Sequence, residues 1–391
     1  MRKRAAAPAL LWGLLWGGGC VLAQAPAKGI PPTPNQFDVY LAAGERWSSN
    51  PEFKPESESF EGDYISDLRA NISLLRKSER TDWSLQYTPF YTRYRETTRL
   101  NTYNHAFDYG GHYSVSRRFR VNLAERFSYI RDPLHLVALG EASPILTEQA
   151  TKRWWSQADA GVEADLSRTL TLDSGVVGRV NRFEDPGLTD SETWAAHAGL
   201  VKHLGRNQTL TTMYTYAVFL LSGDVSDFSS HTLEVGWGHA APGRAEILLS
   251  GGASEVLRQG EQQTWFSGSA SYRQPFRRID LTADFRQGLS ADTGVASVNV
   301  SQNLTAGLSA RIGRNTTLGV TGDYGTRKSA LTGETTVDLS YAGAILRGGV
   351  VVTERISVAA EASRRKQRDA LGTAGDVVVR AYYAGMIFKV F

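Results

Sequence analysis

Residues 297–324 read SVNVSQNLTAGLSARIGRNTTLGVTGDY, and they alternate more strictly between apolar and polar side chains than any other stretch of the chain. From residue 298 to 312 the even positions are largely apolar, and the odd positions are polar or small. Because successive side chains of a β-strand point to opposite faces, this pattern predicts a strand with one apolar and one polar face. Turn-forming residues interrupt it at 313–315, and it resumes from Leu318. The stretch therefore predicts a long β-hairpin.

The length of this hairpin distinguishes between a soluble and a membrane setting. Its first arm covers 16 residues, 297–312, whereas strands of soluble sandwiches usually have about 5 or 6. A tilted strand that crosses a bilayer needs about 9 to 11 residues, with lipid on one side and water on the other. The hairpin favours the membrane setting.

The N-terminus has the three parts of a secretory signal peptide. Residues 2–4 are basic, residues 5–23 are largely apolar, and Ala23-Gln24-Ala25 is a small-x-small cleavage site. We therefore expect a signal peptide over residues 1–25 and a short periplasmic lead-in over residues 26–36. Lipidation at Cys20 is the weaker alternative, because Gly17 stands where a lipoprotein signal has leucine.

Composition excludes several classes of protein. Cleavage after Ala25 removes three of the 43 basic residues and none of the 40 acidic ones, which leaves no net charge and no cysteine. A nucleic-acid-binding protein would carry a basic patch, so we expect no nucleic-acid partner. No apolar run after the signal approaches the roughly 20 residues of a membrane helix. Weak overall apolarity with a persistent period of two is typical of a barrel that faces lipid outside and water inside.

Runs with strand character recur along the chain. They cover approximately residues 37–48, 61–77, 82–97, 102–116, 119–131, 152–167, 169–183, 191–205, 208–221, 229–241, 245–257, 264–276, 278–289, 295–312, 316–327, 335–348, 354–366 and 376–391. The sequence thus predicts an all-β fold, a transmembrane up-and-down antiparallel β-barrel over residues 37–391 with about 18 strands, 16 to 18 being compatible with the pattern.

The connections between these runs alternate in kind. One set is short and basic, as at 205–207 and 313–315, and the other is longer and richer in acidic and small residues, as at 132–151. Outer-membrane barrels have short periplasmic turns and longer external loops, so we expect the short set and both termini on the periplasmic side. Three short turns share one local pattern, which either convergent turn chemistry or hairpin duplication would produce.

The chain ends in Phe391, with Tyr382, Tyr383 and Phe388 close by. In its signal, its hairpin rhythm and this C-terminus it resembles bacterial outer-membrane β-barrel proteins, whose last strand ends in an aromatic residue that the barrel-assembly machinery reads. The resemblance implies an outer-membrane location and Phe391 as the membrane-assembly signal. Lys389 departs from the pattern and leaves open which face of the last strand meets lipid. More loosely, the tyrosines and basic turns look like the barrel porins of exopolysaccharide-export clusters.

Aromatic residues near the ends of the runs predict girdles at the two membrane interfaces, with core packing in a sandwich as the alternative. They are Trp47, Trp83, Trp154, Trp194, Trp265 and Tyr324.

Charged and amide residues on the polar faces of the strands are the candidate functional residues. A charge on the lipid face would cost about 2 to 4 kcal/mol at the midplane, so we expect these side chains to point inward. The predicted pore-lining residues are Asp173, Arg179, Glu234, Asp280, Asp284, Arg286, Asn299, Asn303, Arg311, Asp323, Arg327, Asp338, Glu361 and Arg365. They would either line a hydrated passage or pair with one another to fill a narrow interior.

The longest connection, 132–151, contains six large aliphatic residues. We expect it either to fold into the barrel mouth as a constriction, with Glu141 or Glu148 presented to the passage, or to pack on neighbouring loops or a second protomer.

No pattern predicts an enzyme. The seven histidines have no metal-ligand spacing, and no nucleophile elbow or phosphate-binding loop is present. We expect no catalytic residue, metal or cofactor, although a triad assembled from separate strands is a third alternative. The prediction is a passive porin-like channel for small hydrophilic solutes, and the alternative is an outer-membrane component of a polysaccharide or surface-polymer export system. Expected partners are outer-membrane lipid, the barrel-assembly machinery, and either a second copy or an export-system protein.

Overall fold

The computed structural model describes residues 35–54, 61–131, 152–222, 227–240, 245–258, 260–290, 298–330, 338–369 and 376–390. These residues form eighteen strands and one short 3-10 helix, η2 (Thr98–Leu100). The strands are β1 (Asn35–Ser48), β2 (Asp63–Lys77), β3 (Thr81–Tyr94), β4 (Thr102–Ser114), β5 (Phe119–Ile130), β6 (Arg153–Asp165), β7 (Leu170–Phe183), β8 (Ser191–His203), β9 (Gln208–Leu221), β10 (Phe228–Ala240), β11 (Glu246–Arg258), β12 (Glu261–Pro275), β13 (Ile279–Ser290), β14 (Asn299–Ile312), β15 (Thr316–Ser329), β16 (Asp338–Val351), β17 (Ile356–Asp369) and β18 (Val377–Lys389).

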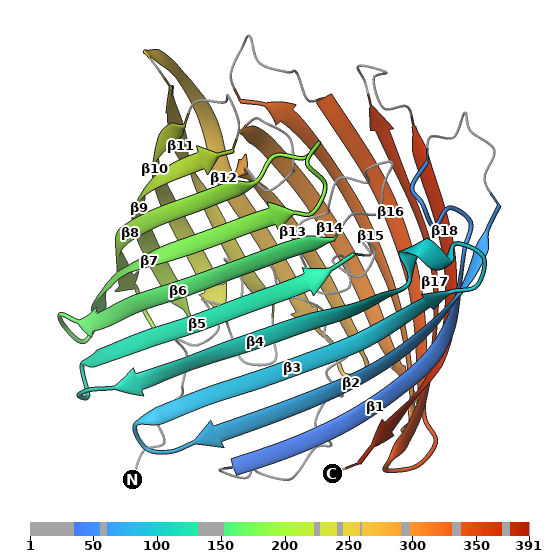
Figure 1. Ribbon diagram of the computed structural model, residues 1–391. Helices are drawn as coiled ribbons and strands as arrows, with labels where there is room; N and C mark the ends of the chain where they lie inside the picture. Colours follow the sequence, from blue (N-terminus) through green and yellow to red (C-terminus); the bar gives the residue numbers. More distant parts are fainter. Residues whose placement is uncertain are drawn as a thin grey trace.

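The strands form one closed antiparallel barrel (Figure 1). Each strand pairs with its neighbours in sequence, and β1 pairs with β18 to complete the ring, with Tyr40 opposite Lys389. At this seam the ammonium of Lys389 lies 2.7 Å from the carboxylate of Asp38 and over the ring of Tyr40. Closure gives every strand two hydrogen-bonded neighbours, so no edge is left unpaired. The predicted up-and-down barrel is confirmed.

The two ends of the barrel differ in their connections. At one end, which we call the short-turn end, β14 and β15 are joined by residues 313–315 and β2 and β3 by residues 78–80. At the other, which we call the long-loop end, residues 49–62 join β1 to β2 and residues 95–101 join β3 to β4. The sequence predicted a strand through residue 97, whereas β3 ends at Tyr94 and η2 follows. In Figure 1 the β2–β3 turn lies at the lower left, and η2 in the β3–β4 connection lies at the right.

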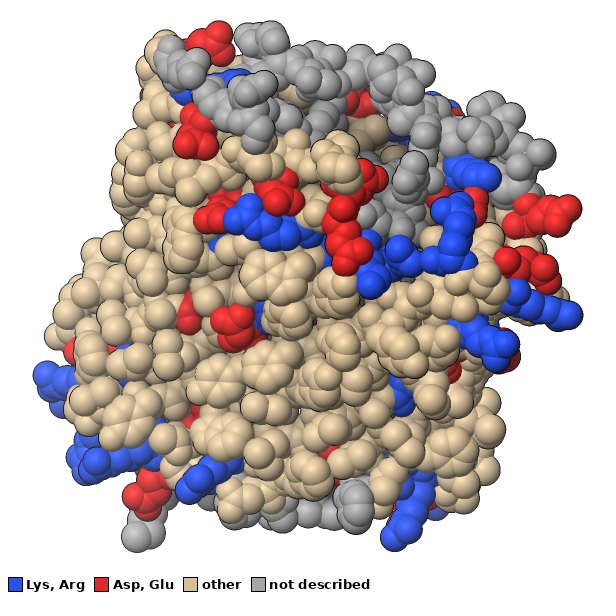
Figure 2. Space-filling view, in the orientation of Figure 1, with Lys and Arg blue, Asp and Glu red and all other residues tan. Residues whose placement is uncertain are grey.

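The outer face of the barrel carries the apolar rows. In β14, Leu304 and Leu308 are exposed, while Asn303 and Thr305 between them are partly buried. The same alternation leaves exposed aliphatic residues on other strands, among them Leu41, Leu68, Leu123, Val176, Leu200, Leu233, Leu249, Leu318, Val320, Leu346, Val358 and Met386. Figure 2 shows a broad belt across the middle of one face with few charged side chains, and charges of both signs above and below it. No helix among the described residues is long and apolar enough to cross a membrane.

Five of the six predicted girdle residues lie on these outer rows. Trp47 of β1 stacks on Tyr382 of β18, with ring centroids 5.7 Å apart, while Trp154, Trp194 and Tyr324 are exposed. Trp83 follows the alternation of its strand and also faces outward. The sixth residue, Trp265, does not lie on an outer row.

Trp265 lies on the inner face of β12, because its neighbour Phe266 is the exposed residue. Its indole N–H donates to the carbonyl of Ala330 at 2.9 Å, and its ring packs against a buried cluster that includes Phe219, Phe228 and Val256. The girdle prediction for Trp265 was wrong because an indole near a strand end can equally fill the inside of the barrel.

The last strand settles the question that Lys389 raised. Phe388 and Val390 are exposed on the outer face, and Lys389 turns inward to Asp38. The lipid-facing row of β18 is therefore the even row, which also contains Tyr382 and Met386. Phe391, the predicted assembly signal, lies outside the described residues.

Candidate functional site

The candidate site is the inner wall of the barrel, formed by the rows that alternate with the exposed aliphatic residues. Thirteen of the predicted pore-lining residues lie on these inner rows, as the burial patterns of their strands show. They are Asp173, Arg179, Glu234, Asp280, Asp284, Arg286, Asn299, Asn303, Arg311, Asp323, Arg327, Glu361 and Arg365. Arg311 is the one at the short-turn end of its row, where it is exposed.

Asp338 is the exception. It belongs to the even row of β16, the row of the exposed Leu346, so it lies on the outer face. There its carboxylate is 3.8 Å from the ammonium of Lys328 on β15. The expectation that Asp338 lines the interior was wrong because this residue begins the strand at the long-loop end, where the outer surface meets water and a charge there is not costly.

Two strands of the inner wall are joined across a third. Asp323 of β15, Gly343 of β16 and Arg365 of β17 lie opposite one another in register. The guanidinium of Arg365 reaches over Gly343 to within 3.0 Å of the Asp323 carboxylate. A Cβ on residue 343 would collide with that carboxylate. Glycine at this position is therefore what allows the ion pair to span two strand spacings.

The surroundings of Arg365 hold it in place. Its guanidinium lies over the ring of Tyr341, 5.9 Å from the centroid, and the Tyr341 hydroxyl donates to the side-chain oxygen of Asn303. Nearer the short-turn end, Arg347 donates to Glu361 at 2.7 Å directly across β16 and β17. This part of the wall, from β14 to β17, thus holds two groups of interacting side chains, which together contain four of the predicted residues.

A second network lies on the wall from β4 to β6, and the sequence analysis did not identify it. Arg126 donates to Asp108 directly opposite at 2.8 Å. Glu163 accepts from Arg120 at 2.6 Å and from the amide of Asn122 at 3.0 Å. Their strands do alternate, because Tyr103, Phe107, Tyr109 and Tyr113 all fall on the odd row of β4 and Asp108 falls on its even row. In β5 the exposed Leu123 belongs to the odd row, whereas Asn122 and Arg126 belong to the even row. This alternation was the signal from which the inward direction of Asn122 and Arg126 could have been predicted.

The network continues through β7 and β8. Arg179 donates to the side-chain oxygen of Gln157 at 3.1 and 3.2 Å, and the Gln157 amide donates to Asp159 at 2.9 Å. The Asp173 carboxylate lies 3.9 Å from a ring nitrogen of His197. Positive and negative groups therefore alternate around this side of the interior, and neither sign dominates it.

The rim at the long-loop end is held by buried polar groups. Asp63, at the start of β2, is 1 % exposed and accepts backbone N–H groups of Arg95, Glu96 and Thr97 at 2.8 to 3.2 Å. One carboxylate thus satisfies three backbone donors of the β3–β4 connection. The mouth next to η2 is fixed in shape by this contact.

Glu52 anchors the preceding loop to the same rim. It accepts from Lys54 at 2.9 Å and from Arg99 of η2. Burial alone would raise the pKa of Glu52, but the hydrogen bonds from Lys54 and Arg99 outweigh it, and the pKa is lowered from its ordinary value of 4.5. The carboxylate therefore stays charged and ties residues 50–54 to the β3–β4 connection.

The described residues contain no group of three or more His, Cys, Asp or Glu side chains placed to hold a metal ion. The constriction candidates Glu141 and Glu148 fall outside the described residues. What the inner wall offers is a mixed-charge surface of hydrogen-bond donors and acceptors.

A closed antiparallel barrel that turns aliphatic rows outward and charged rows inward is the architecture of outer-membrane β-barrels. This chain has the fold of an outer-membrane β-barrel of eighteen strands. No protein-family model and no curated protein matches its sequence.

Solved structures resemble it in overall shape. OccAB4 of Acinetobacter baumannii is 7% identical, with 91% of this chain and 98% of that chain covered and a TM-score of 0.48. OccK2 (OpdF) of Pseudomonas aeruginosa, in complex with glucuronate, is 11% identical, with 91% and 98% covered and a TM-score of 0.47. The siderophore receptor PirA of P. aeruginosa is 13% identical, with 93% and 81% covered and a TM-score of 0.43. At these values the likenesses carry no information on what the barrel transports.

Proposed function

We propose that the barrel is a passive channel for small hydrophilic solutes. The observation that carries this proposal is the charged inner wall of a closed ring of eighteen strands. Strands spaced about 4.8 Å apart and tilted by about 40° enclose a backbone diameter on the order of 35 Å. Rings of this size leave an aqueous channel, whereas barrels of about 8 strands are filled by their side chains.

The ion pairs on the wall determine the selectivity in this proposal. Asp323 with Arg365 and Asp108 with Arg126 present both signs at nearly the same point. A solute passing such pairs meets hydrogen-bond donors and acceptors without a strong net field, so weak selectivity between anions and cations is expected. The segment 132–151, with Glu141 and Glu148, remains our predicted constriction, and deleting residues 133–148 would raise single-channel conductance if that prediction is correct.

The test is conductance of the purified barrel in planar bilayers, with swelling of liposomes in neutral sugars of increasing size. A steady open conductance and size-limited sugar uptake are expected. A barrel that stays closed across voltage and pH, and opens only with another envelope protein, would contradict the passive channel and favour the alternative, a component of polymer export. Recognition of the last strand by the barrel-assembly machinery remains a further prediction.

A further inference from the structure

Two arginines face each other on the outer surface of the barrel. Arg364 of β17 and Arg380 of β18 are direct cross-strand partners, and both belong to exposed outer rows. Like charges placed directly opposite destabilise a sheet. Neither guanidinium has an acidic partner among the described residues, whereas Arg347 and Arg365 on the inner wall each pair with a carboxylate. The guanidinium N–H groups of Arg364 and Arg380 thus have no carboxylate to bind among the described residues.

The outer face of β17 carries two more cationic side chains. Lys366 and Arg368 follow Arg364 on the outer row, and one carboxylate, Asp376, serves both at 2.9 and 3.7 Å. We call Arg364, Lys366, Arg368 and Arg380 the outer basic patch. Asp376 neutralises one of its four charges, so the patch keeps a positive excess at Arg364 and Arg380.

The position of the patch relative to the bilayer follows from its aromatic neighbours. Tyr382 is the next outer residue of β18 after Arg380, and it stacks on Trp47. Because Trp and Tyr gather at the boundary between hydrocarbon and headgroups, this stacked pair marks that boundary. Arg380 lies on the long-loop side of it, where lipid headgroups are found.

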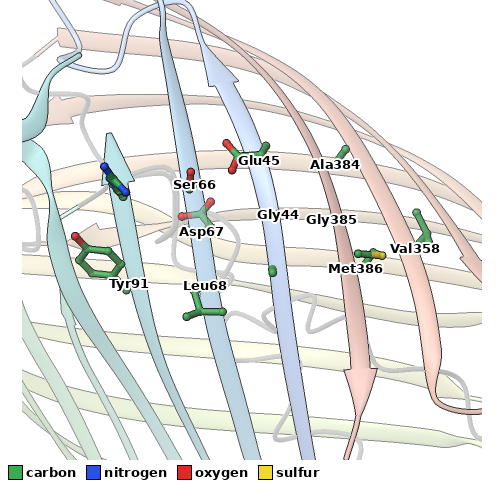
Figure 3. A pocket seen from close by; sticks show the side chains of 12 residues that line it. Gly44, Glu45, Ser66, Asp67, Leu68, Tyr91, Val358, Ala384, Gly385 and Met386 are labelled. Atoms are coloured by element: carbon green, nitrogen blue, oxygen red, sulfur yellow. The ribbon is translucent and has the colours of Figure 1, made fainter. Parts of the chain in front are cut away.

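A groove lies on the other side of the same aromatic pair. It occupies about 590 Å³ on the outer face over β17, β18 and β1 to β3 (Figure 3). Small residues form its floor, among them Ala43, Ser66 and Ala384, while Met386 and Leu68 form part of its walls. Ala384 is the next outer residue of β18 after Tyr382, so patch, aromatic pair and groove follow one another along one strand.

Two opposite charges line the groove at the same level. Glu45 is exposed on the groove wall opposite Ser66 and Ala384, and Arg93 is exposed on the other side of Ser66. The carboxylate and the guanidinium offset each other there, so this level has no excess positive charge to hold an anion. Arg364 and Arg380 have no acidic partner among the described residues, so an amphiphile would place its anionic group at these two arginines and its apolar tail in the groove.

We propose that this face of β17, β18 and β1 binds one phosphorylated lipid of the outer leaflet, with a phosphate held between Arg364 and Arg380 and an acyl chain in the groove. Guanidinium groups bind phosphate oxygens in a bidentate manner, and two of them on adjacent strands can share a single phosphate. The bound phosphate removes the repulsion between the two arginines, so the lipid also stabilises the β17–β18 pair.

The test uses the intact barrel in detergent, with bound lipid counted by native mass spectrometry. The probes are lipid A with two phosphates, the same lipid after enzymatic dephosphorylation, and inorganic phosphate. The double variant R364Q/R380Q is compared with R314Q/R355Q, which removes two exposed arginines from the short turns and makes the same change in charge. We expect the diphosphorylated lipid to bind about tenfold more weakly to R364Q/R380Q. The control should bind it as the original barrel does.

A second variant tests the groove alone. The double substitution A43L/A384L fills the floor with side chains that suit a lipid-facing surface, so the barrel should still fold. Lipid retention should fall while the arginines remain. Equal retention by R364Q/R380Q and its control, equal binding of the dephosphorylated lipid, or displacement of the lipid by inorganic phosphate at millimolar concentration would each overturn the proposal.

Discussion

Arg365 reaches across β16 to Asp323 and passes over Gly343, so that an ion pair of 3.0 Å joins two strands that are not neighbours. Ion pairs between adjacent strands are common, but this one needs the missing side chain of the strand between. The arrangement couples three strands of the wall at a point where the side chains also face the proposed passage.

Replacing Asp323 by Asn should destabilise the barrel and shift its selectivity. The change leaves the largely buried guanidinium of Arg365 without its charged partner, which we expect to lower the free energy of unfolding by about 1 to 3 kcal/mol. The added positive field should favour anions, as seen in the reversal potential under a salt gradient. Asp338→Asn is the matched control, because Asp338 pairs with Lys328 on the outer face. An equal shift of reversal potential in both variants would contradict the prediction that Asp323 affects selectivity because it faces the passage.

Replacing Gly343 by Ala should disrupt the same ion pair without changing any charge. The new methyl group collides with the Asp323 carboxylate, so one of the two must move, at a cost of about 1 to 3 kcal/mol in unfolding free energy. Gly288→Ala is the control, because a Cβ there meets nothing within 4 Å. Urea unfolding in lipid vesicles measures both. If Gly288→Ala lowered the unfolding free energy as much as Gly343→Ala, the loss would reflect a general effect of replacing glycine on the inner wall and not the collision with Asp323.

Adjacent residues of β14 should respond in opposite ways to the same substitution. Leu304→Arg places a charge on the lipid face and should cost about 2 to 4 kcal/mol if it lies near the midplane. Thr305→Arg places it on the inner wall and should cost far less, while it changes conductance. Folding yield into vesicles and single-channel recordings distinguish the two. Similar costs at both positions would contradict the assignment of inner and outer rows.

The loop contact of Glu52 should depend on pH in a defined direction. Because its folded pKa is lowered below 4.5, the contact stabilises the folded state above that value and is lost as the pH falls through the folded pKa. The difference in melting temperature between the original protein and E52Q should therefore be present at pH 7 and diminish progressively as the pH is lowered below 4.5. A difference that did not diminish with pH in this acid range would show that packing, and not the charge, holds residues 50–54.

The strands could be predicted from the sequence because their signal is local. The alternation around Leu304 or Leu318 requires only neighbouring residues, and it fixed both the strand and its faces. The pairing of Asp323 with Arg365 could not be predicted, since it depends on the register of three strands and on the space above Gly343. Asp338 was misplaced for a related reason, because alternation gives the direction of a side chain relative to its strand and not the depth of the residue in the membrane.

The seam between β1 and β18 has a consequence for biogenesis. Lys389, the last residue of β18, forms an ion pair with Asp38 near the start of β1. The strand that is synthesised first therefore acquires its second partner strand only when the last strand has been made. If β18 did not pair with β1, both strands would present unpaired backbone groups, which favour aggregation. The closing contacts join the first and the last strand of the barrel, so the ring can form only once β18 is available.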